Sequence, residues 1–215
     1  MTRKRSYDDA CGIARALDTV GERWSLMVVR ELLMGPKRFT DLRASLPAIG
    51  PDVLTQRLRD LDAAGIVFKH KLPPPAASTV YELTDSGKAL EPVLQELGRW
   101  GGCYAPPPAE GQCMSLDAHL LSLRTLFDPA LAGDLRARVA LRLDGQDFYA
   151  AIADGAIDVQ RGTITEPDLV VRGTAADFLG IVRGLTTVRD APVEMSGDPD
   201  LAERFFTLFP LPVPA

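Results

Sequence analysis

The stretch that decides the fold of the first half of the chain is GPDVLTQRLRDLDAAGIV, residues 50–67. Three side chains in it recur at the i, i+4, i+7 spacing of a single helix stripe: Leu54, Leu58 and Leu61. At about 100° per residue, Gln56 and Arg59 fall roughly opposite that stripe. The pattern therefore predicts a helix over 51–64 that buries its leucines and presents long hydrogen-bonding side chains to a partner.

Length and charge divide the chain into two halves of different character. Its 215 residues can form one large domain or two small ones. Residues 1–104 carry 15 Lys and Arg against 13 Asp and Glu, whereas residues 105–215 carry 9 against 16. The segment YAPPPAEGQC (104–113) contains three consecutive prolines, which cannot continue a helix. We therefore expect two domains, 1–104 and 114–215, joined by a Pro-rich linker at 105–113.

Several classes of protein find no support in the sequence. No apolar run approaches the roughly 18–20 residues that span a bilayer, and the start lacks a secretory signal, so a cytoplasmic protein without membrane contact is expected. The chain contains no G-x-S-x-G, P-loop, H-E-x-x-H or G-x-G-x-x-G motif. Its three cysteines lack CxxC spacing and indicate neither a zinc site nor a disulfide framework. We expect no enzymatic activity, no metal and no cofactor.

The first half has the pattern of helices followed by a hairpin. Apolar periodicity predicts helices at 9–20, 23–34, 39–46, 51–64 and 85–101. The short connection PAIGP between the third and fourth helices has the length that sets two helices at a steep angle. The segments IVFKHKL and VYELT then predict two strands on either side of PPPAAST. This order is that of a winged helix-turn-helix, in which the second helix of the motif enters the DNA major groove and the wing reaches phosphate.

A series of short motifs runs through residues 11–101: an early Cys, the Trp of ERW, RFTDL, LTQRL, YELT-x-x-G and a closing W-G. In this order and spacing they resemble the HxlR family of bacterial transcriptional regulators. The resemblance implies a winged module that dimerises through its first and last helices and binds a two-fold-related operator. Val93, Leu97 and Trp100 form an i, i+4, i+7 stripe that one module alone cannot fully bury, which agrees with a homodimer.

Eight polar side chains are candidates for contact with double-stranded DNA. Gln offers a donor and an acceptor to an adenine edge and Arg matches guanine O6 and N7, so Gln56 and Arg59 are expected to read bases. Basic residues before the motif and on the wing suit phosphates. The candidates are Lys37, Arg38, Thr40, Thr55, Gln56, Arg59, Lys69 and Lys71. For each of them the alternative is a solvated polar face, and Arg57, near the leucine stripe, is assigned to an intramolecular ion pair.

The second half alternates strands and helices. A helix at 115–127 precedes ARVALRLDG and DFYAAIADGAIDVQRG, whose period-2 stretches and Gly-rich turns predict an antiparallel meander. A strand at 168–173 and helices at 174–184 and 198–209 follow. The segments PDLVVRGT, SGD and FFTLF make residues 114–210 resemble a sterol carrier protein type 2-like domain.

The second resemblance implies helices over a five-stranded sheet, with an apolar tunnel for acyl chains or similar ligands. The expected fold class of the whole chain is therefore α+β, with a winged helix-turn-helix followed by an antiparallel sheet covered by helices. The candidate lining residues are Phe178, Val182, Leu185, Phe205, Phe206 and Phe209. Plain core packing is the alternative for these side chains.

Together the patterns favour a dimeric HxlR-like repressor whose second domain binds an apolar small molecule and thereby changes DNA affinity. In some members of the resembled family a cysteine at the position of Cys11 senses oxidants or electrophiles. A thiol-switch regulator with a structural second domain is therefore one alternative, although a lone cysteine near an apolar helix is also a small buried hydrophobe. A lipid-carrier or protein-interaction module is the other alternative.

Overall fold

The computed structural model describes residues 6–75, 77–106, 109, 112 and 114–212. The chain forms two compact units, residues 1–94 and 95–215, which are described separately. The division falls within helix α6 (Glu91–Tyr104), before the expected linker at 105–113. The expected domain limits therefore stay a prediction.

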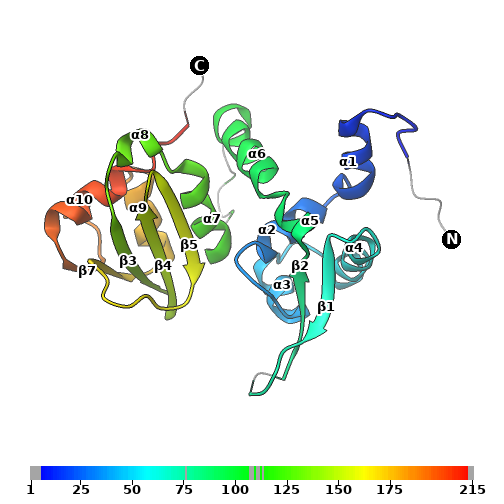
Figure 1. Ribbon diagram of the computed structural model, residues 1–215, viewed down its shortest axis with the longest axis horizontal. Helices are drawn as coiled ribbons and strands as arrows, with labels where there is room; N and C mark the ends of the chain where they lie inside the picture. Colours follow the sequence, from blue (N-terminus) through cyan, green and yellow to red (C-terminus); the bar gives the residue numbers. More distant parts are fainter. Residues whose placement is uncertain (1–5, 76, 107–108, 110–111, 113, 213–215) are drawn as a thin grey trace. The chain divides into compact units, whose positions relative to one another are not determined.

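The described residues of the first unit form five helices, the start of α6 and a two-stranded sheet (Figure 1). The elements are α1 (Gly12–Val20), α2 (Ser25–Leu32), α3 (Phe39–Ser45), α4 (Pro51–Ala63), β1 (Val67–Lys71), β2 (Thr79–Leu83) and α5 (Asp85–Lys88). The single helix expected at 85–101 is thus two helices, α5 and α6. Pro92 explains the second start, because proline lacks the backbone N–H and fits only the first turn of a helix.

Helix α4 packs into the core of the first unit as its sequence predicts. Gly50 is the N-cap and Pro51 occupies the first turn, where its missing N–H costs nothing. Leu54, Leu58 and Leu61 are at most 2% exposed. They join a buried cluster that includes Val28 and Val29 of α2, Leu42 of α3, and Val67 and Leu83 at the base of the hairpin.

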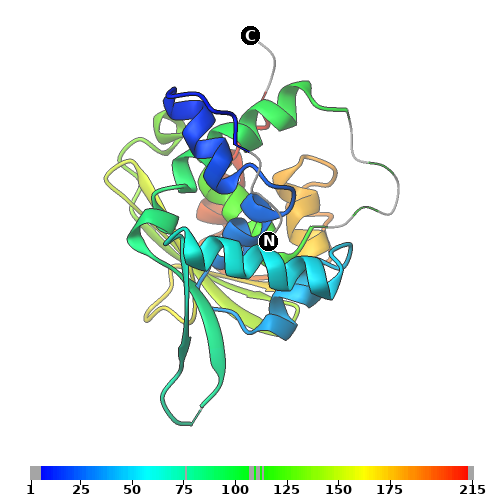
Figure 2. The ribbon, with the colours of Figure 1, turned by 90° about the vertical axis from the view of Figure 1, so that its right-hand side faces the viewer.

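The hairpin of β1 and β2 forms the wing. Its strands pair antiparallel from Val67 opposite Leu83 to Lys71 opposite Thr79. Figure 2 shows the wing projecting from the helices, with α4 passing near its base. A backbone bridge between Lys37 and Tyr81 adds one more pairing on the β2 side of the ribbon.

The second unit is a five-stranded sheet with strand order β5-β4-β3-β6-β7 and helices on one face (Figure 1). Its elements are the part of α6 from Gln95 onward, α7 (Leu116–Leu126), α8 (Pro129–Ala132), β3 (Ala137–Leu143), β4 (Gln146–Ala153), β5 (Ala156–Arg161), β6 (Leu169–Gly173), α9 (Ala175–Val182), β7 (Glu194–Gly197) and α10 (Pro199–Thr207). Strand β4 alternates as the period-2 pattern predicts, with Phe148, Ala150 and Ile152 buried and the residues between them partly exposed. On β3, Val139, Leu141 and Leu143 are fully buried and Arg142 is exposed, but the small Ala140 is buried too.

The sheet is mixed, which corrects the expected antiparallel sheet. The meander β3-β4-β5 is antiparallel as expected, and β7 is antiparallel to β6. Strand β6 instead runs parallel to β3, with Leu169 opposite Val139. The chain leaves β5 on one side of β4 and reaches the far side of β3 through residues 162–168, so β6 is not joined to its neighbour by a hairpin turn. Alternation along a strand is the same in both directions, so the sequence pattern does not reveal this.

Candidate nucleic-acid interface

The outer face of α4 carries the expected base-reading side chains. Gln56 and Arg59 are exposed, and Thr55 on the flank is half-buried. The Gln56 side-chain amide donates to Asp60 Oδ1 at 2.8 Å, and the Thr55 hydroxyl donates to the Pro51 carbonyl at 2.8 Å. Within the described part of the chain Arg59 makes no hydrogen bond or ion pair, so its guanidinium is available to a partner.

Arg57 has the intramolecular role that its position near the leucine stripe predicts. Its Nη1 lies 3.4 Å from Glu22 Oε2 and 3.3 Å from Asp60 Oδ2, and its side chain is 15% exposed. The same carboxylate of Asp60 also receives the Gln56 amide. Asp60 therefore holds Gln56 through one carboxylate oxygen and Arg57 through the other, whereas Arg59 is exposed.

Lys37 does not lie where a phosphate contact requires it, which corrects the expectation for this residue. It is 7% exposed, and its ammonium donates to Glu31 Oε2 at 2.7 Å and to Ser45 Oγ at 3.1 Å. Its main chain is also fixed, since its N–H and C=O both bond to the backbone of Tyr81. The bridge to β2 turns the side chain inward, and the buried carboxylate then receives the charge.

Glu31 is the second member of this buried cluster, and the sequence prediction missed it. Its side chain is fully buried, and its Oε1 accepts from Arg30 Nη2 at 2.7 Å. Burial alone raises the pKa of the Glu31 carboxyl, but the opposite charges and hydrogen bonds of Lys37 and Arg30 outweigh it and hold that pKa below its usual value. The sequence does contain a sign of this buried carboxylate: Glu31 lies within the apolar run SLMVVRELL, three positions after the buried Val28.

The remaining expected phosphate contacts lie on the surface. Arg38 is the N-cap residue of α3 and is exposed, as is Thr40 in the first turn, whose hydroxyl donates to Asp41 Oδ1 at 3.4 Å. Lys69 and Lys71 are exposed on β1.

The Lys69 ammonium lies 5.8 Å from the centroid of the Tyr81 ring on the neighbouring strand. The alternate residues of β1 form a separate cluster, in which Phe68 stacks on His70 and His70 Nε2 lies 2.8 Å from Glu82 Oε2. His70 is therefore engaged within the wing, whereas the two lysines extend to solvent.

Cys11 is exposed and caps the N-terminus of α1. The alternative that it is a buried hydrophobic residue is therefore wrong. Its backbone N–H donates to Asp9 Oδ1 at 2.8 Å. Accessibility is what a thiol switch requires, although the geometry by itself assigns no chemistry to this cysteine.

Helices α6 and α1 each expose more than one large apolar side chain. On α6 they follow the predicted stripe and extend it by one turn: Val93, Leu97, Trp100 and Tyr104 are 49–59% exposed. The rings of Trp100 and Tyr104 lie 6.0 Å apart. On α1, Ile13 is 72% and Leu17 39% exposed. Such surfaces are typical of sites that a partner covers.

The residues expected to line a tunnel form a packed core in the second unit. Phe178, Phe205 and Phe209 are at most 1% exposed, and Phe206 and Val182 are also buried. The ring centroid of Phe206 lies 5.4 Å from those of both Phe178 and Phe205, and Phe205 lies 5.1 Å from Phe209. These are the distances of directly packed aromatic pairs, so the rings fill the space among themselves.

Leu185 is 78% exposed, which corrects its assignment as a lining residue. Helix α9 ends at Val182, and Gly184 follows with a φ of +67°, a conformation that glycine adopts without strain. This turn carries Leu185 away from the interior.

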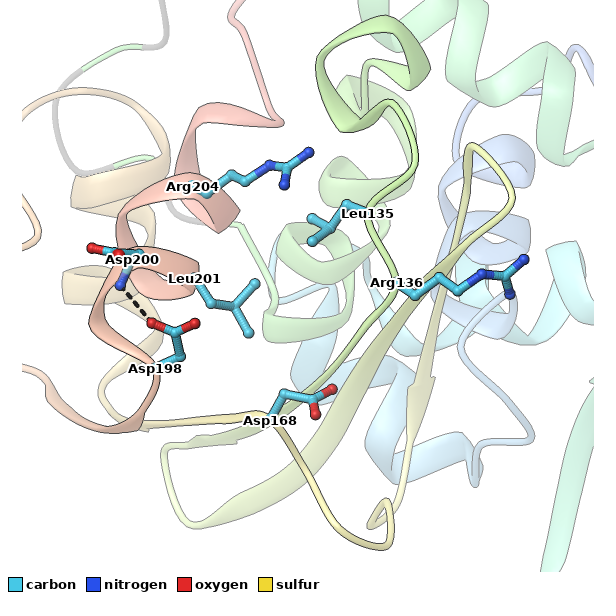
Figure 3. A pocket seen from close by; sticks show the side chains of 7 residues that line it. All are labelled: Leu135, Arg136, Asp168, Asp198, Asp200, Leu201 and Arg204. Atoms are coloured by element: carbon cyan, nitrogen blue, oxygen red, sulfur yellow. Dashed lines mark hydrogen bonds between the residues drawn. The ribbon is translucent and has the colours of Figure 1, made fainter.

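A pocket of about 430 Å³ lies elsewhere in the second unit, beside the N-terminal half of α10 (Figure 3). Its lining side chains are Leu135, Arg136, Asp168, Asp198, Asp200, Leu201 and Arg204. Leu135 and Leu201 point toward each other, and charged groups surround them (Figure 3). Four of those groups are already engaged: Asp198 caps α10, Asp168 accepts from the Arg138 N–H at 2.7 Å, Arg136 pairs with Asp154, and Arg204 donates to the Ala132 carbonyl at 2.9 Å. None of the six expected lining residues contributes to this pocket.

Among the described residues, no group of three or more His, Cys, Asp or Glu side chains is placed to hold a metal ion. No helix in the part of the chain that the structure describes has both the length and the apolarity to cross a membrane.

Comparison with known proteins places the first half of the chain in a family. Residues 19–108 match the family model of the HxlR-like helix-turn-helix. The HTH-type transcriptional regulator YvaP of Bacillus subtilis is 37% identical over 93 residues, which cover 43% of this chain and 86% of the relative. The HTH-type transcriptional regulator Mb3122 of Mycobacterium bovis is 36% identical over 146 residues, 66% of this chain and 90% of the relative.

A solved structure, the reduced form of the transcriptional regulator YodB from B. subtilis, is 31% identical with a TM-score of 0.41 and covers 47% of this chain and all of that chain. The sterol-carrier-like resemblance of the second half stays a prediction. The matches in sequence carry the assignment, because YvaP exceeds 30% identity across most of its own length. The chain belongs to the HxlR-like helix-turn-helix family and is a DNA-binding transcriptional regulator.

Proposed function

We propose that the chain acts as a dimeric repressor that reads its operator with α4 and holds the flanking phosphates with the wing. The observation that carries this proposal is the outward guanidinium of Arg59, which is exposed on the face of α4 opposite three buried leucines. A free guanidinium at this place matches guanine O6 and N7 in the major groove. Lys69 and Lys71 supply positive charge on a projecting ribbon, where contacts to phosphate add affinity without sequence preference.

The proposed dimer rests on the apolar side chains of α6 and α1. An operator with two-fold symmetry requires two recognition helices about one turn of DNA apart, which one module cannot supply. The stripe of Val93, Leu97 and Trp100 is about half exposed in a single chain. A second copy that covers it removes apolar surface from water, which is the main favourable contribution to such association.

The function is tested by selecting duplexes from a random-sequence pool with the full-length protein, followed by binding titrations from 50 to 200 mM salt. We expect a two-fold-related sequence that binds at least about 10³-fold more tightly than random DNA. Affinity for both should fall steeply with salt because phosphate contacts release counterions. A protein that enriches no sequence, or whose binding is insensitive to salt, contradicts this proposal.

An apolar small-molecule effector in the second unit stays a prediction. A ligand regulates DNA affinity only if it binds the free and DNA-bound conformations differently. Because the four phenylalanines are packed in contact with one another, such a ligand has to displace these rings or bind beside them. Because the chain is a DNA-binding regulator, the lipid-carrier or protein-interaction alternative now applies to the second unit alone.

The exposed thiol of Cys11 favours a second candidate input, a switch that responds to oxidants or electrophiles. One experiment separates the two inputs. Operator binding by the parent and by Cys11→Ser is measured with mild peroxide and, in parallel, with a panel of fatty acids and hydrophobic aromatic compounds. A peroxide response lost in Cys11→Ser assigns the input to the thiol. A panel compound that raises Tm and weakens DNA binding in both proteins assigns it to the second unit.

A further inference from the structure

Of the lysines that the structure describes in the first unit, only Lys37 is buried. It connects three elements. Its Nζ donates to Glu31 of α2 and to Ser45 of α3. Its backbone N–H donates to the Tyr81 carbonyl at 3.0 Å, and its carbonyl accepts from the Tyr81 N–H at 2.8 Å. A single residue thus joins α2, α3 and the β2 strand of the wing.

The bridge is important because it fixes the backbone of the wing at the middle of β2. Val67 and Leu83 at the base of the strands join the buried core, Tyr81 packs against it, and Val80 is 2% exposed, but these contacts are apolar and carry no direction of their own. A two-stranded ribbon by itself is marginally stable, so its direction depends on what holds the base. Tyr81 occupies the middle of β2, directly opposite Lys69, and the Lys69 ammonium lies over the Tyr81 ring. Lys37 therefore supports the wing at the level of the lysine that is expected to reach phosphate.

The chemistry of the cluster favours a role in geometry over a role in stability. A buried ion pair recovers little more than the cost of removing two charges from water, and a well-packed apolar pair is often as stable. A charged pair with hydrogen bonds is, however, directional. Glu31 receives Lys37 on one carboxylate oxygen and Arg30 on the other, so the carboxylate cannot rotate without breaking a bond.

We propose that Lys37 is a positioning residue for DNA binding, which fixes the wing relative to α2 and α3 so that Lys69 and Lys71 reach phosphate while α4 lies in the groove. This inference rests on the proposed DNA-reading function. It assigns Lys37 an effect on affinity without contact with DNA.

The test compares four variants of the full-length protein on the selected operator. Lys37→Met removes the charge at nearly constant length, and Glu31→Gln with Lys37→Met removes both charges, so that no unpaired carboxylate is left buried. Ser45→Ala removes one hydrogen bond and leaves the ion pair. Lys88→Met is the matched control, because it removes the same charge from an exposed lysine of α5 that lies 3.9 Å from Asp85.

Two measurements are made on each folded variant. The first is the slope of log affinity against log salt, which reports the number of phosphates contacted, at about 0.9 per contact. The second is hydrogen exchange of the Tyr81 backbone amide, which reports the bridge without DNA. With Lys37→Met, alone or with Glu31→Gln, the salt slope should become shallower by at least about 0.9 and operator affinity should fall on the order of tenfold. Exchange of the Tyr81 amide should accelerate in the same variants. Ser45→Ala should show smaller changes in the same direction.

A double-mutant cycle gives the sharpest criterion. If Lys37 acts through the wing, Lys69→Ala should cost much less in the Lys37→Met background than in the parent. The inference is overturned if the losses of affinity caused by Lys37→Met and Lys69→Ala simply multiply. It is also overturned if the folded variant that carries both Glu31→Gln and Lys37→Met keeps the salt slope and the Tyr81 exchange rate of the parent. Failure of the proposed function has a different signature: the parent itself then selects no duplex, whereas the amide-exchange comparison still decides whether Lys37 holds the wing.

Discussion

Replacement of Arg59 by alanine should remove the strongest base contact that the structure offers. The side chain is exposed on the outer face of α4 and makes no intramolecular bond among the described residues, so the substitution has little to break in the free protein. Exposed substitutions of this kind usually change stability by no more than about 0.5 kcal/mol. A bidentate contact to guanine is worth about 1–3 kcal/mol, so each protomer should lose roughly 5- to 150-fold in operator affinity.

Arg57→Ala is the matched control, because this arginine lies two positions earlier on the same helix and is held by Glu22 and Asp60. It should lower the free energy of unfolding while leaving base preference intact. The assay is a fluorescence-anisotropy titration of both variants on the selected operator and on duplexes changed at each base in turn. Arg59→Ala should tolerate a change at one base position in each half-site. If Arg59→Ala binds the operator as tightly as the parent, or keeps full preference at every position, the orientation assigned to α4 is wrong.

Three further predictions concern the dimer, the buried cluster and the exposed thiol. Leu97→Glu on the half-exposed stripe of α6 should convert the dimer to monomer in light scattering, since an unpaired carboxylate would be buried at the covered apolar surface. An unchanged dimer mass would remove α6 from the interface. Because the folded-state pKa of Glu31 is lowered, the contribution of Glu31 to stability is present above pH about 4.5 and is lost as pH falls through the folded-state pKa. Glu31→Gln should therefore flatten the acid limb of a plot of unfolding free energy against pH. Acid limbs of equal slope in the parent and the variant would contradict this. Without oxidant, Cys11→Ser should bind the operator as tightly as the parent does, because the side chain at this position is exposed and not part of the packed core. Weaker binding by Cys11→Ser under these conditions would assign Cys11 a structural role instead.

The features that follow from local periodicity could be predicted from the sequence. The i, i+4, i+7 leucines fix which side of α4 is buried, and the same angles place Arg57 against the core and Arg59 outside it. The α6 stripe follows from the same rule. In each case one element determines the outcome, because the side-chain direction depends only on the helix to which the residue belongs.

Features that depend on two distant segments could not be predicted in this way. Lys37 and Lys69 look alike in sequence, yet Lys37 is buried because Glu31 and Tyr81, 6 and 44 positions away, fix its side chain and backbone. The direction of β6 is set by which strand it joins, and its alternation is the same either way. The sequence pattern identifies Phe178, Phe205, Phe206 and Phe209 as interior residues, but whether an interior is filled or hollow depends on how the rings meet.

The charge that remains on the surface allows one quantitative prediction for the whole interface. With Lys37 buried, three of the expected phosphate-binding cations stay available on each protomer: Arg38, Lys69 and Lys71. Residues 105–215 hold 16 acidic against 9 basic side chains, so the second half offers no excess positive charge to add to them. At about 0.9 per contact, six contacts in a dimer give a slope of log affinity against log salt of about −5. A fourth contact from Lys37 would raise this to about −7, so a measured slope near −7 in the parent would contradict the buried role of Lys37 when DNA is bound.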